Sequence, residues 1–343
     1  MGNIKDRLFI ELLFGIAISM LIVFITIYMP LLGFFMAIIL PMPILYFRLK
    51  LGRNIGATIM FVVLAMSFAA TNMLSGSTDP ELSSSLIKSS SFTPSIDMLF
   101  YGALLLIGFF LGEFIEMRLS IEKSFIYTLF STVGVCSALF FLYALSTDQG
   151  ALDLVSKYVS DNLKLTLALY EDMGMSPESI EAIVASMEAI EYLLTRIIPA
   201  LVITLLSFIL WVNILFIKKI LTKKGISLIE LESLNLWRAP DYLVWVVIFL
   251  GILMMIFGKD IKMIAFNCIM IIMPVYFFQG IAIISFIFEK KRLPTLFQIA
   301  IYSIIAIQQV LILAIIGLGF FDTWLNFRKI GVINGSDGQS SDG

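Results

Sequence analysis

The sequence predicts an all-α fold: a polytopic bundle of about nine transmembrane helices with an amphipathic helical pair on its extracytoplasmic side. Three observations predict it. Hydrophobic residues make up 60% of the 343 residues and charged residues only 14%, against roughly 25% in soluble domains. Several apolar runs reach the roughly 20 residues that a helix needs to cross a hydrocarbon core. The connections between these runs alternate between basic and acidic, which orients the bundle.

The first apolar region predicts a helical hairpin, because residues 8–47 are too long for one straight crossing and Pro30 and Gly33 interrupt them. Each later apolar run predicts one crossing. The nine predicted crossings are residues 8–28, 31–47, 55–74, 98–117, 124–145, 192–217, 239–257, 261–288 and 296–321.

Lysine and arginine gather in every second connection, and such connections face the cytoplasm. This rule predicts a cytoplasmic amino end and, with nine crossings, an extracytoplasmic carboxyl end. The basic residues that carry the assignment are Lys5, Arg7, Arg48, Lys50, Arg53, Arg118, Lys123, Lys218, Lys219, Lys223, Lys224, Arg238, Lys290, Lys291 and Arg292.

Two longer segments are predicted on the outer side. Residues 75–96 are serine-rich and lack an apolar stripe, so we expect a mobile loop. Residues 147–191 carry apolar positions at helical spacing and predict two amphipathic helices joined near Gly174, the second starting at Ser176 and Pro177. Their polar face is acidic, which fits either a solvated cap or a lid or docking surface.

These assignments divide the chain into four parts. Residues 1–145 form an amino-terminal membrane bundle of five helices, and residues 146–191 form the extracytoplasmic amphipathic helices. Residues 192–321 form a second membrane bundle of four helices. Residues 322–343 hold a short polar motif and a small-residue tail that we expect to be disordered.

The composition excludes several classes of chemistry. The chain has no histidine, which removes imidazole-based zinc sites and Ser-His-Asp or Cys-His catalysis. It has neither a phosphate-binding GxxxxGK[ST] loop nor a Rossmann glycine fingerprint, so nucleotide energy would have to come from a partner. Cys136 and Cys268 lie in different predicted crossings and are interpreted as packing residues. We predict no cofactor, no metal and no nucleic-acid partner, and an enzyme is the third choice of function.

Polar groups within crossings are candidates for function, because hydrocarbon penalises them unless they have partners. Glu113 lies among apolar neighbours and either changes protonation in a proton-coupled carrier or pairs with Arg118 or Lys123 at the cytoplasmic interface. Pro274 interrupts the eighth crossing and Asn267 shares a face with it, so a kink there could open a cavity. Gln279 lies in the same crossing, and hydrogen bonding between helices is its simplest interpretation.

Four stretches resemble the YybS-like family of bacterial multi-pass membrane proteins. The stretches are LPMPILYFRLKLGRNIG (40–56), NLWRAPDYLVW (235–245), Asn267 followed by YFFQG (276–280), and GLGFFDTWLNFRK (317–329). The resemblance covers nearly the whole chain and implies a location in the bacterial cytoplasmic membrane, but no particular chemistry. The basic turn RLKLGRNIG after a P-x-P helix end is also similar to the substrate-binding S-components of energy-coupling-factor transporters, which rely on separate ATPases.

Two sets of residues follow as candidates. Asn267, Pro274, Tyr276, Gln279 and Glu113 are the candidate cavity-lining residues. The carboxyl-terminal motif is Asp322, Trp324 and Arg328: Trp324 is a typical interface anchor, and Asp322 could pair with Arg328 or Lys329.

Two functions from different classes fit this sequence. The first is a transport or small-solute-binding subunit without its own ATPase, whose basic connection from Lys218 to Arg238 is available to a membrane-protein or ATPase partner. The second is a non-transporting scaffold or regulator of envelope processes, which contacts another protein through the outer helical pair.

Overall fold

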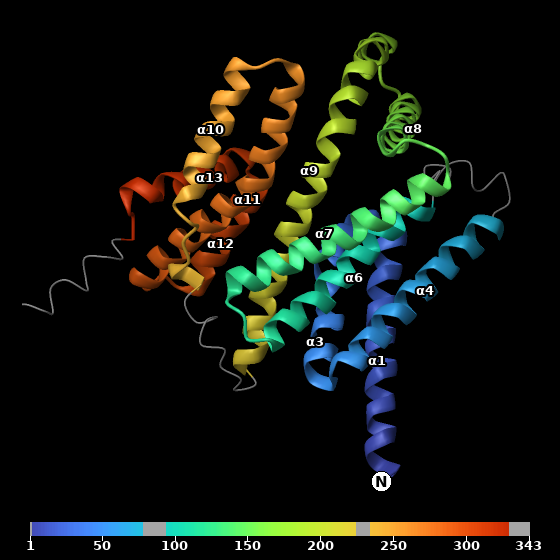
Figure 1. The fold of residues 1–343 in the computed structure, drawn as a ribbon, viewed down its shortest axis with the longest axis vertical. Helices are drawn as coiled ribbons and strands as arrows, with labels where there is room; N and C mark the ends of the chain where they lie inside the picture. The colour runs from blue at the N-terminus through green and yellow to red at the C-terminus, as the bar shows by residue number, and fades with distance from the viewer. Residues whose placement is uncertain (1, 78–93, 224–233, 329–343) are drawn as a thin grey trace, which may run out of the picture. The chain divides into compact units, whose positions relative to one another are not determined.

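The structure is a computed structural model that describes residues 2–77, 94–223 and 234–328. Every regular element in these ranges is a helix, as the sequence predicts (Figure 1). The chain divides into two compact units, each described by itself. Unit 1 comprises Met1–Ile198 and Leu205–Ile226, and unit 2 comprises Pro199–Thr204 and Ser227–Gly343. The expected mobile loop and the carboxyl-terminal tail fall mainly outside the described residues.

Unit 1 begins with the predicted hairpin. Helix α1 spans Gly2–Tyr28, and the chain turns at Met29 into α2 (Pro30–Ile39) and α3 (Pro41–Leu51). Both later helices start with proline, whose missing N–H costs nothing in the first turn. Gly33 lets α2 approach α1, because a Cβ there would lie 2.5 Å from the carbonyl oxygen of Thr26. The hairpin prediction is confirmed.

Helices α4 (Arg53–Ser77), α6 (Pro94–Glu116) and α7 (Ile121–Ser146) complete the amino-terminal bundle. Helix α3 packs against both α4 and α6, and α7 packs along α6. Ser120 caps α7 by accepting a hydrogen bond from the N–H of Lys123. The core of the unit lies along α3 and α6, where Leu40, Ile44 and Leu104 are fully buried.

The predicted amphipathic pair corresponds to α8 (Ala151–Asp172) and the start of α9 (Pro177–Lys223). The break lies at Gly174, which adopts a φ of +76°. One part of the prediction was wrong: the second outer helix and the sixth crossing are a single helix of 47 residues. No breaker separates Ile190 from Tyr192, and Pro199 stays within the helix. At 1.5 Å per residue, α9 is about 70 Å long, more than twice the hydrocarbon thickness.

Unit 2 contains a 3₁₀ turn η2 (Leu234–Leu236), α10 (Tyr242–Ile256) and α11 (Lys259–Lys290). Its last two helices are α12 (Thr295–Ile307) and α13 (Gln309–Leu325), and α13 packs closely on α11. Two predicted crossings differ here. Helix α10 has only 15 residues, or about 22 Å. Helices α12 and α13 meet at Gln308 with a bend of 106°, so residues 296–321 are not one straight crossing.

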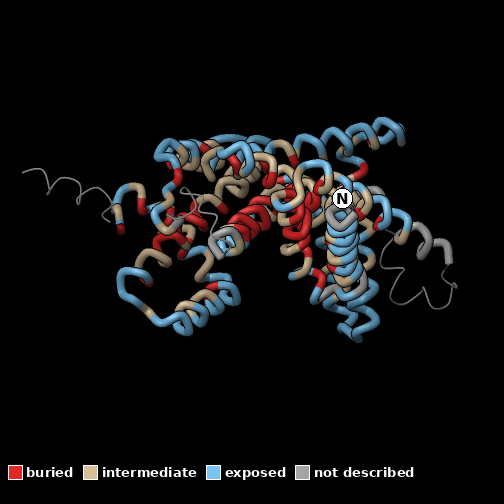
Figure 2. The backbone as a smooth tube through the Cα atoms, turned by 90° about the horizontal axis from the view of Figure 1, so that it is seen from below, coloured by how far each residue is buried: buried red, intermediate tan, exposed pale blue. Residues whose placement is uncertain are grey.

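Seven helical spans in the described ranges are long and apolar enough to cross a membrane, and the bent pair raises the number to at most eight. The nine predicted crossings comprise these seven spans and two others: α10, which is apolar but has only 15 residues, and the bent pair α12 and α13. Figure 2 shows that many turns in both units expose residues to the surroundings. Large apolar side chains are prominent among the exposed ones, including Phe61, Phe130 and Trp245. Such faces are stable when lipid rather than water surrounds them.

Candidate functional site

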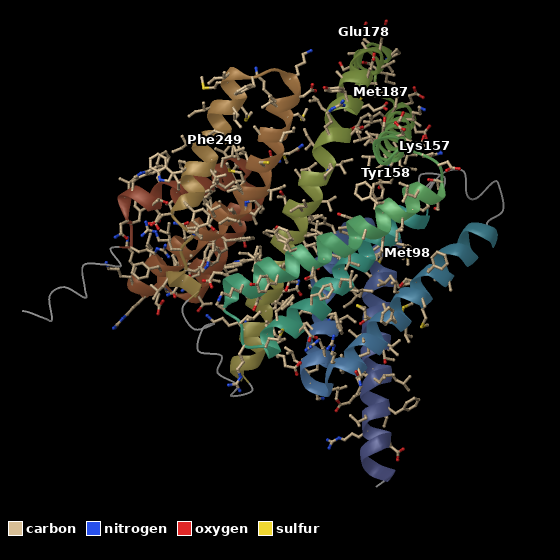
Figure 3. All side chains as sticks on the ribbon, in the orientation of Figure 1. Met98, Lys157, Tyr158, Glu178, Met187 and Phe249 are labelled. Carbon is tan, nitrogen blue, oxygen red and sulfur yellow. The ribbon has the colours of Figure 1, made fainter. Side chains whose placement is uncertain are left out.

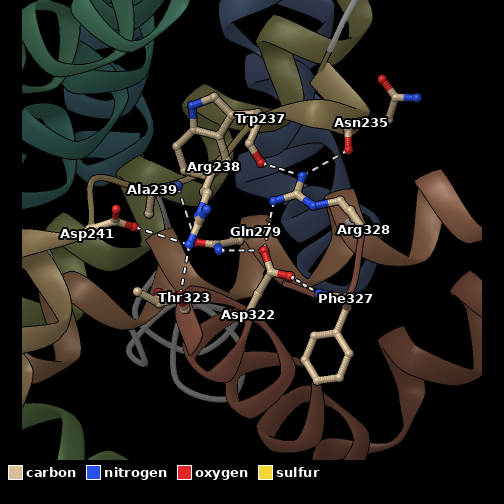
Figure 4. Close-up of polar contacts among 10 residues, drawn as sticks. All are labelled: Asn235, Trp237, Arg238, Ala239, Asp241, Gln279, Asp322, Thr323, Phe327 and Arg328. Carbon is tan, nitrogen blue, oxygen red and sulfur yellow. Dashed lines mark hydrogen bonds and ion pairs between the residues drawn. The ribbon is translucent and has the colours of Figure 1, made fainter. Parts of the chain in front are cut away.

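Three of the stretches singled out in the sequence meet in unit 2 (Figure 4). At their centre Nη2 of Arg328 donates to Oδ2 of Asp322 at 2.9 Å, and both side chains are only 1% exposed. This confirms the pairing between Asp322 and Arg328. We call the group Asn235, Trp237, Ala239, Gln279, Asp322 and Arg328 the carboxyl-terminal clamp.

Arg328 ties the carboxyl-terminal motif to the segment before α10. Its Nη1 donates to the carbonyl oxygens of Asn235, at 3.1 Å, and Trp237, at 2.8 Å. Asp322 in turn accepts from the N–H of Phe327 at 2.9 Å and so closes the end of α13. An ion pair that is buried needs such additional hydrogen bonds, because desolvation costs each charge several kcal/mol.

Gln279 joins α11 to the same clamp. Its Oε1 accepts from the N–H of Ala239 at 3.2 Å, and its Nε2 donates to Oδ2 of Asp322 at 3.1 Å. Close by, Arg238 donates to the carbonyl oxygen of Thr323 at 3.0 Å. The Gln279 side chain is fully buried, so its amide serves contacts between segments, the simpler of its interpretations.

Glycines bring the backbones of α11 and α13 together beside the clamp. A Cβ on Gly319 would collide with the carbonyl oxygen of Tyr276, and a Cβ on Gly280 would collide with that of Ile315. Tyr276 packs its ring edge-on against Phe320, with the centroids 5.2 Å apart. Its hydroxyl is buried and has no hydrogen-bond partner among the described residues. The motif glycines therefore have a packing role.

The remaining predicted residues of unit 2 lie on the same two helices. Pro274 is buried within α11, and Asn267 is half-buried on that helix. Trp324 is half-exposed near the end of α13 and packs against Phe320, with the ring centroids 5.4 Å apart. The clamp thus brings together Gln279, Asp322 and Arg328 from the predicted sets. The cavity predicted around Asn267 and Pro274 stays a prediction.

Glu113 takes part in a separate ion-pair cluster in unit 1. Arg48 is fully buried on α3, and its two terminal nitrogens contact Glu113 at 2.5 Å and Glu116 at 2.9 Å, both on α6. Arg53 approaches Glu113 at 3.5 Å. The prediction that Glu113 pairs with Arg118 or Lys123 was wrong. Arg48 had been placed in a connection, but no breaker follows Phe47, so α3 continues to Leu51.

The glycines around Arg48 make room for its side chain. A Cβ on Gly56 would lie 2.7 Å from Cβ of Arg48, and a Cβ on Gly112 would lie 2.6 Å from its Cδ. The guanidinium also lies 5.5 Å from the centroid of the Phe109 ring. Arg48 therefore joins α3 to α6, and its positive charge compensates the negative charge of Glu113.

A pocket of about 390 Å³ lies between α8 and α9 in unit 1. Figure 3 shows the two helices, with Lys157 and Tyr158 on α8 and Glu178 and Met187 on α9. Ser156 on α8 donates to Oε1 of Glu191 on α9 at 2.7 Å. We call this pocket the α8–α9 pocket. The residues that line it are Leu152, Asp153, Ser156, Glu188, Glu191, Tyr192, Thr195 and Arg196.

Sequence reasoning missed this pocket because it assigned its residues to different parts of the chain. The predicted outer helices end at residue 191 and the sixth predicted crossing begins at residue 192, so the lining residues of α9 fall on both sides of that boundary. Glu188, Glu191, Thr195 and their neighbours follow helical spacing across that predicted boundary, which was the available signal. Arg196 extends one turn back toward the start of α9, where its guanidinium lies 3.7 Å from the centroid of the Tyr192 ring.

The described residues contain no group of three or more cysteine, aspartate or glutamate side chains that could hold a metal ion. The two cysteines are free. In the clamp and the Arg48 cluster the charged side chains contact one another, whereas the α8–α9 pocket has room for a ligand.

Comparison with known families gives one match. A family model described as "Predicted membrane protein (DUF2232)" matches residues 17–78 and 82–323, nearly the whole chain. No curated protein and no solved structure matches the chain. With its seven helical spans of membrane-crossing length, the match identifies a multi-pass integral membrane protein.

Proposed function

Because the chain belongs to the DUF2232 family of predicted membrane proteins, we propose that it is a membrane subunit that binds a small solute. The α8–α9 pocket carries this proposal. Its volume of about 390 Å³ lies within the 300–1,000 Å³ typical of small-molecule sites. Polar groups from two helices line it, as expected of a site that orients a solute.

We infer that the pocket lies near the outer surface of the bacterial cytoplasmic membrane. The basic connections favour a cytoplasmic amino end, which puts α8 and the start of α9 on the opposite side. Tyr192 lies where the acidic start of α9 gives way to its apolar part, and tyrosine is enriched at such boundaries. A pocket at this level is accessible to a solute from outside.

The carboxyl end needs a different assignment from the one that nine crossings predict. Arg328 contacts the carbonyl groups of Asn235 and Trp237, which lie within the basic connection from Lys218 to Arg238. Two groups in hydrogen-bond contact cannot lie on opposite faces of a bilayer about 30 Å thick. We therefore place Arg328 and this connection on the cytoplasmic side, with α12 and α13 entering and leaving from one face.

Solute binding would serve transport together with a separate ATPase. The chain lacks a phosphate-binding loop, and the basic connection from Lys218 to Arg238 is the region we propose for a partner. The similarity of residues 40–56 to S-components favours this division of labour, and we keep the YybS-like naming as part of the same proposal. The cavity proposed near Asn267 and Pro274 would be a second solute-contacting region.

The test is purification of the full chain from native membranes, followed by mass spectrometry of bound small molecules and partner proteins. We expect a solute that is present with the wild-type protein and lost from Ser156→Phe, whose ring fills the α8–α9 pocket. Helix content and melting temperature should match, which controls for misfolding. Equal solute content in both proteins contradicts the proposal.

A scaffold or regulator of envelope processes is the second candidate. The clamp and the Arg48 cluster favour it, because both join segments that are distant in the sequence and so stiffen their units. Purification separates the two functions: a stoichiometric complex with envelope proteins and no bound solute supports a scaffold.

A further inference from the structure

The bend between α12 and α13 lies at the depth of the hydrocarbon. The two helices meet at Gln308, where the chain changes direction by 106° (Figure 1). Helix α12 follows the basic residues 290–292 and has 13 residues. At 1.5 Å per residue it is about 20 Å long, so its far end reaches the interior of a hydrocarbon core about 30 Å thick. The bend is therefore inside the membrane whether the pair re-enters or crosses it.

The bend exposes hydrogen-bonding groups. Gln308 has extended backbone, with φ −96° and ψ 104°, which interrupts the helical ladder of backbone hydrogen bonds. Gln308 and Gln309 are both exposed, and neither side-chain amide forms a hydrogen bond with any residue that the structure describes. Acyl chains have neither donors nor acceptors, so lipid alone leaves both amides unsatisfied.

Apolar side chains surround the two glutamines. Ile307 is 81% exposed, Val310 67% and Leu313 70%. Residues 294–321 contain no charged side chain, so like charges do not oppose the approach of an identical surface. An exposed apolar surface with amides at its centre fits association between helices, because glutamine side chains hydrogen-bond across helix interfaces in membranes.

Hydrogen-bond complementarity indicates a second copy of this chain as the partner. A glutamine amide has both donors and an acceptor, so two identical amides can pair with each other. Copies inserted with the same orientation bring their own Gln308 and Gln309 to the same depth. A different protein would need a matching donor and acceptor at that level, whereas a second copy supplies both.

We propose that two copies of this chain associate in the membrane through the α12–α13 bend. Gln308 and Gln309 of one copy bond to the same residues of the other around a two-fold axis along the membrane normal, and Ile307 and Val310 pack around them. Dimers with two-fold symmetry are the commonest soluble oligomers, and their interfaces use the same patch on both copies. This inference goes beyond the proposed function and does not depend on solute binding at the α8–α9 pocket.

Energy transfer between two labelled populations of the full chain in lipid vesicles measures the association. The labels are attached at Met173→Cys, which is far along the chain from the bend, in a Cys136→Ala, Cys268→Ala background. The dependence of energy transfer on the protein-to-lipid ratio gives the association constant. We expect the wild-type bend to support dimers at protein-to-lipid ratios at which a variant without the two amides is monomeric.

Matched variants test the role of the amides. Replacing both residues, as Gln308→Leu with Gln309→Leu, should weaken association at least tenfold, because leucine removes the amides and keeps an apolar surface. Gln298→Leu should leave association unchanged, since Gln298 also lies on α12 but its Nε2 donates to the carbonyl oxygen of Leu293 at 2.9 Å. Equal helix content of all variants, measured by circular dichroism, controls for misfolding.

Cross-linking locates the contact. In the cysteine-free background, Gln308→Cys should give a disulfide-linked dimer when membranes are oxidised with copper phenanthroline. Phe249→Cys should not, although Phe249 is 59% exposed near the middle of α10.

Four results would overturn the proposal. The first is a wild-type chain that is monomeric at every protein-to-lipid ratio. The second is a dimer that the double leucine variant leaves intact, which would place the interface elsewhere. The third is a cross-link in native membranes from Gln308→Cys to a different protein. The fourth is rapid reaction of Gln308→Cys with a membrane-impermeant methanethiosulfonate, which would show that water rather than a second copy surrounds the bend.

Discussion

The carboxylate of Asp322 and the guanidinium of Arg328 lie 2.9 Å apart, six residues from each other in the chain, and both are withdrawn from the surroundings. Each also bonds to a third segment: Asp322 to Gln279 of α11, and Arg328 to carbonyl groups before α10. This pair therefore sets where α13 ends within unit 2.

The first prediction concerns this pair. Asp322→Ala leaves a buried guanidinium without its counter-charge and should lower stability by about 3–5 kcal/mol. The measurement is the melting temperature in detergent, with intrinsic fluorescence as the signal of unfolding. Asp241→Ala is the control, because Asp241 is 70% exposed and lies 3.4 Å from Arg238, so its loss should cost about 0–1 kcal/mol. Equal effects of the two substitutions would show that the clamp contributes little.

The second prediction concerns the buried arginine of unit 1. Arg48→Lys should destabilise the protein by about 2–4 kcal/mol, because a single ammonium group cannot place two separate donors on Glu113 and Glu116. Arg53→Lys should have almost no effect, since Arg53 is 68% exposed and 3.5 Å from Glu113. Chemical denaturation in mixed micelles measures the free energy of unfolding of both variants. An Arg48→Lys protein as stable as the wild type would contradict the role of the two-pronged guanidinium contact with Glu113 and Glu116.

The third prediction uses two glycines on one helix. Gly319→Ala should destabilise the protein by at least about 2 kcal/mol, because its Cβ meets the backbone of Tyr276 and α11 and α13 would have to separate. Gly317→Ala, two residues away, meets nothing within 4 Å and should be neutral or slightly stabilising. Melting temperatures of the two variants decide the matter. The prediction fails if both behave alike.

The fourth prediction concerns topology. Single cysteines at Phe327 and Leu236, in a Cys136→Ala, Cys268→Ala background, should react with a membrane-impermeant maleimide from the same side. A cysteine at Met173, which is exposed between α8 and α9, should react from the other side. Labelling of intact cells and of inverted vesicles measures this. Reaction of Phe327→Cys and Leu236→Cys from opposite sides would restore a ninth crossing.

The sequence was sufficient to predict the helices and the breaks that proline or glycine produces. The hairpin at Met29–Pro30 and the turn at Gly174 were predicted for this reason. The bend at Gln308 was not, because neither Gln308 nor Gln309 restricts the backbone and the change of direction depends on packing of α13 against α11. The helix propensity of neighbouring residues does not depend on such contacts between helices.

The candidate site was predictable to a smaller extent. The pairing of Asp322 with Arg328 followed from their proximity in the chain, whereas the contact of Arg48 with Glu113 joins residues 65 positions apart. The α8–α9 pocket depends on α9 continuing past Tyr192, which the change from acidic to apolar composition concealed. Charge patterns locate residues relative to a membrane, but contacts between residues that are distant in the sequence can be predicted only when the packing of the helices is known.

The clamp also imposes an order on biosynthesis. The carbonyl groups of Asn235 and Trp237 leave the ribosome 93 and 91 residues before the guanidinium that binds them. At a translation rate of about 5–20 residues per second, they wait several seconds for Arg328. Throughout that interval Gln279 and the segment before α10 lack the hydrogen bonds that Asp322 and Arg328 provide, so the clamp is complete only when Arg328 arrives.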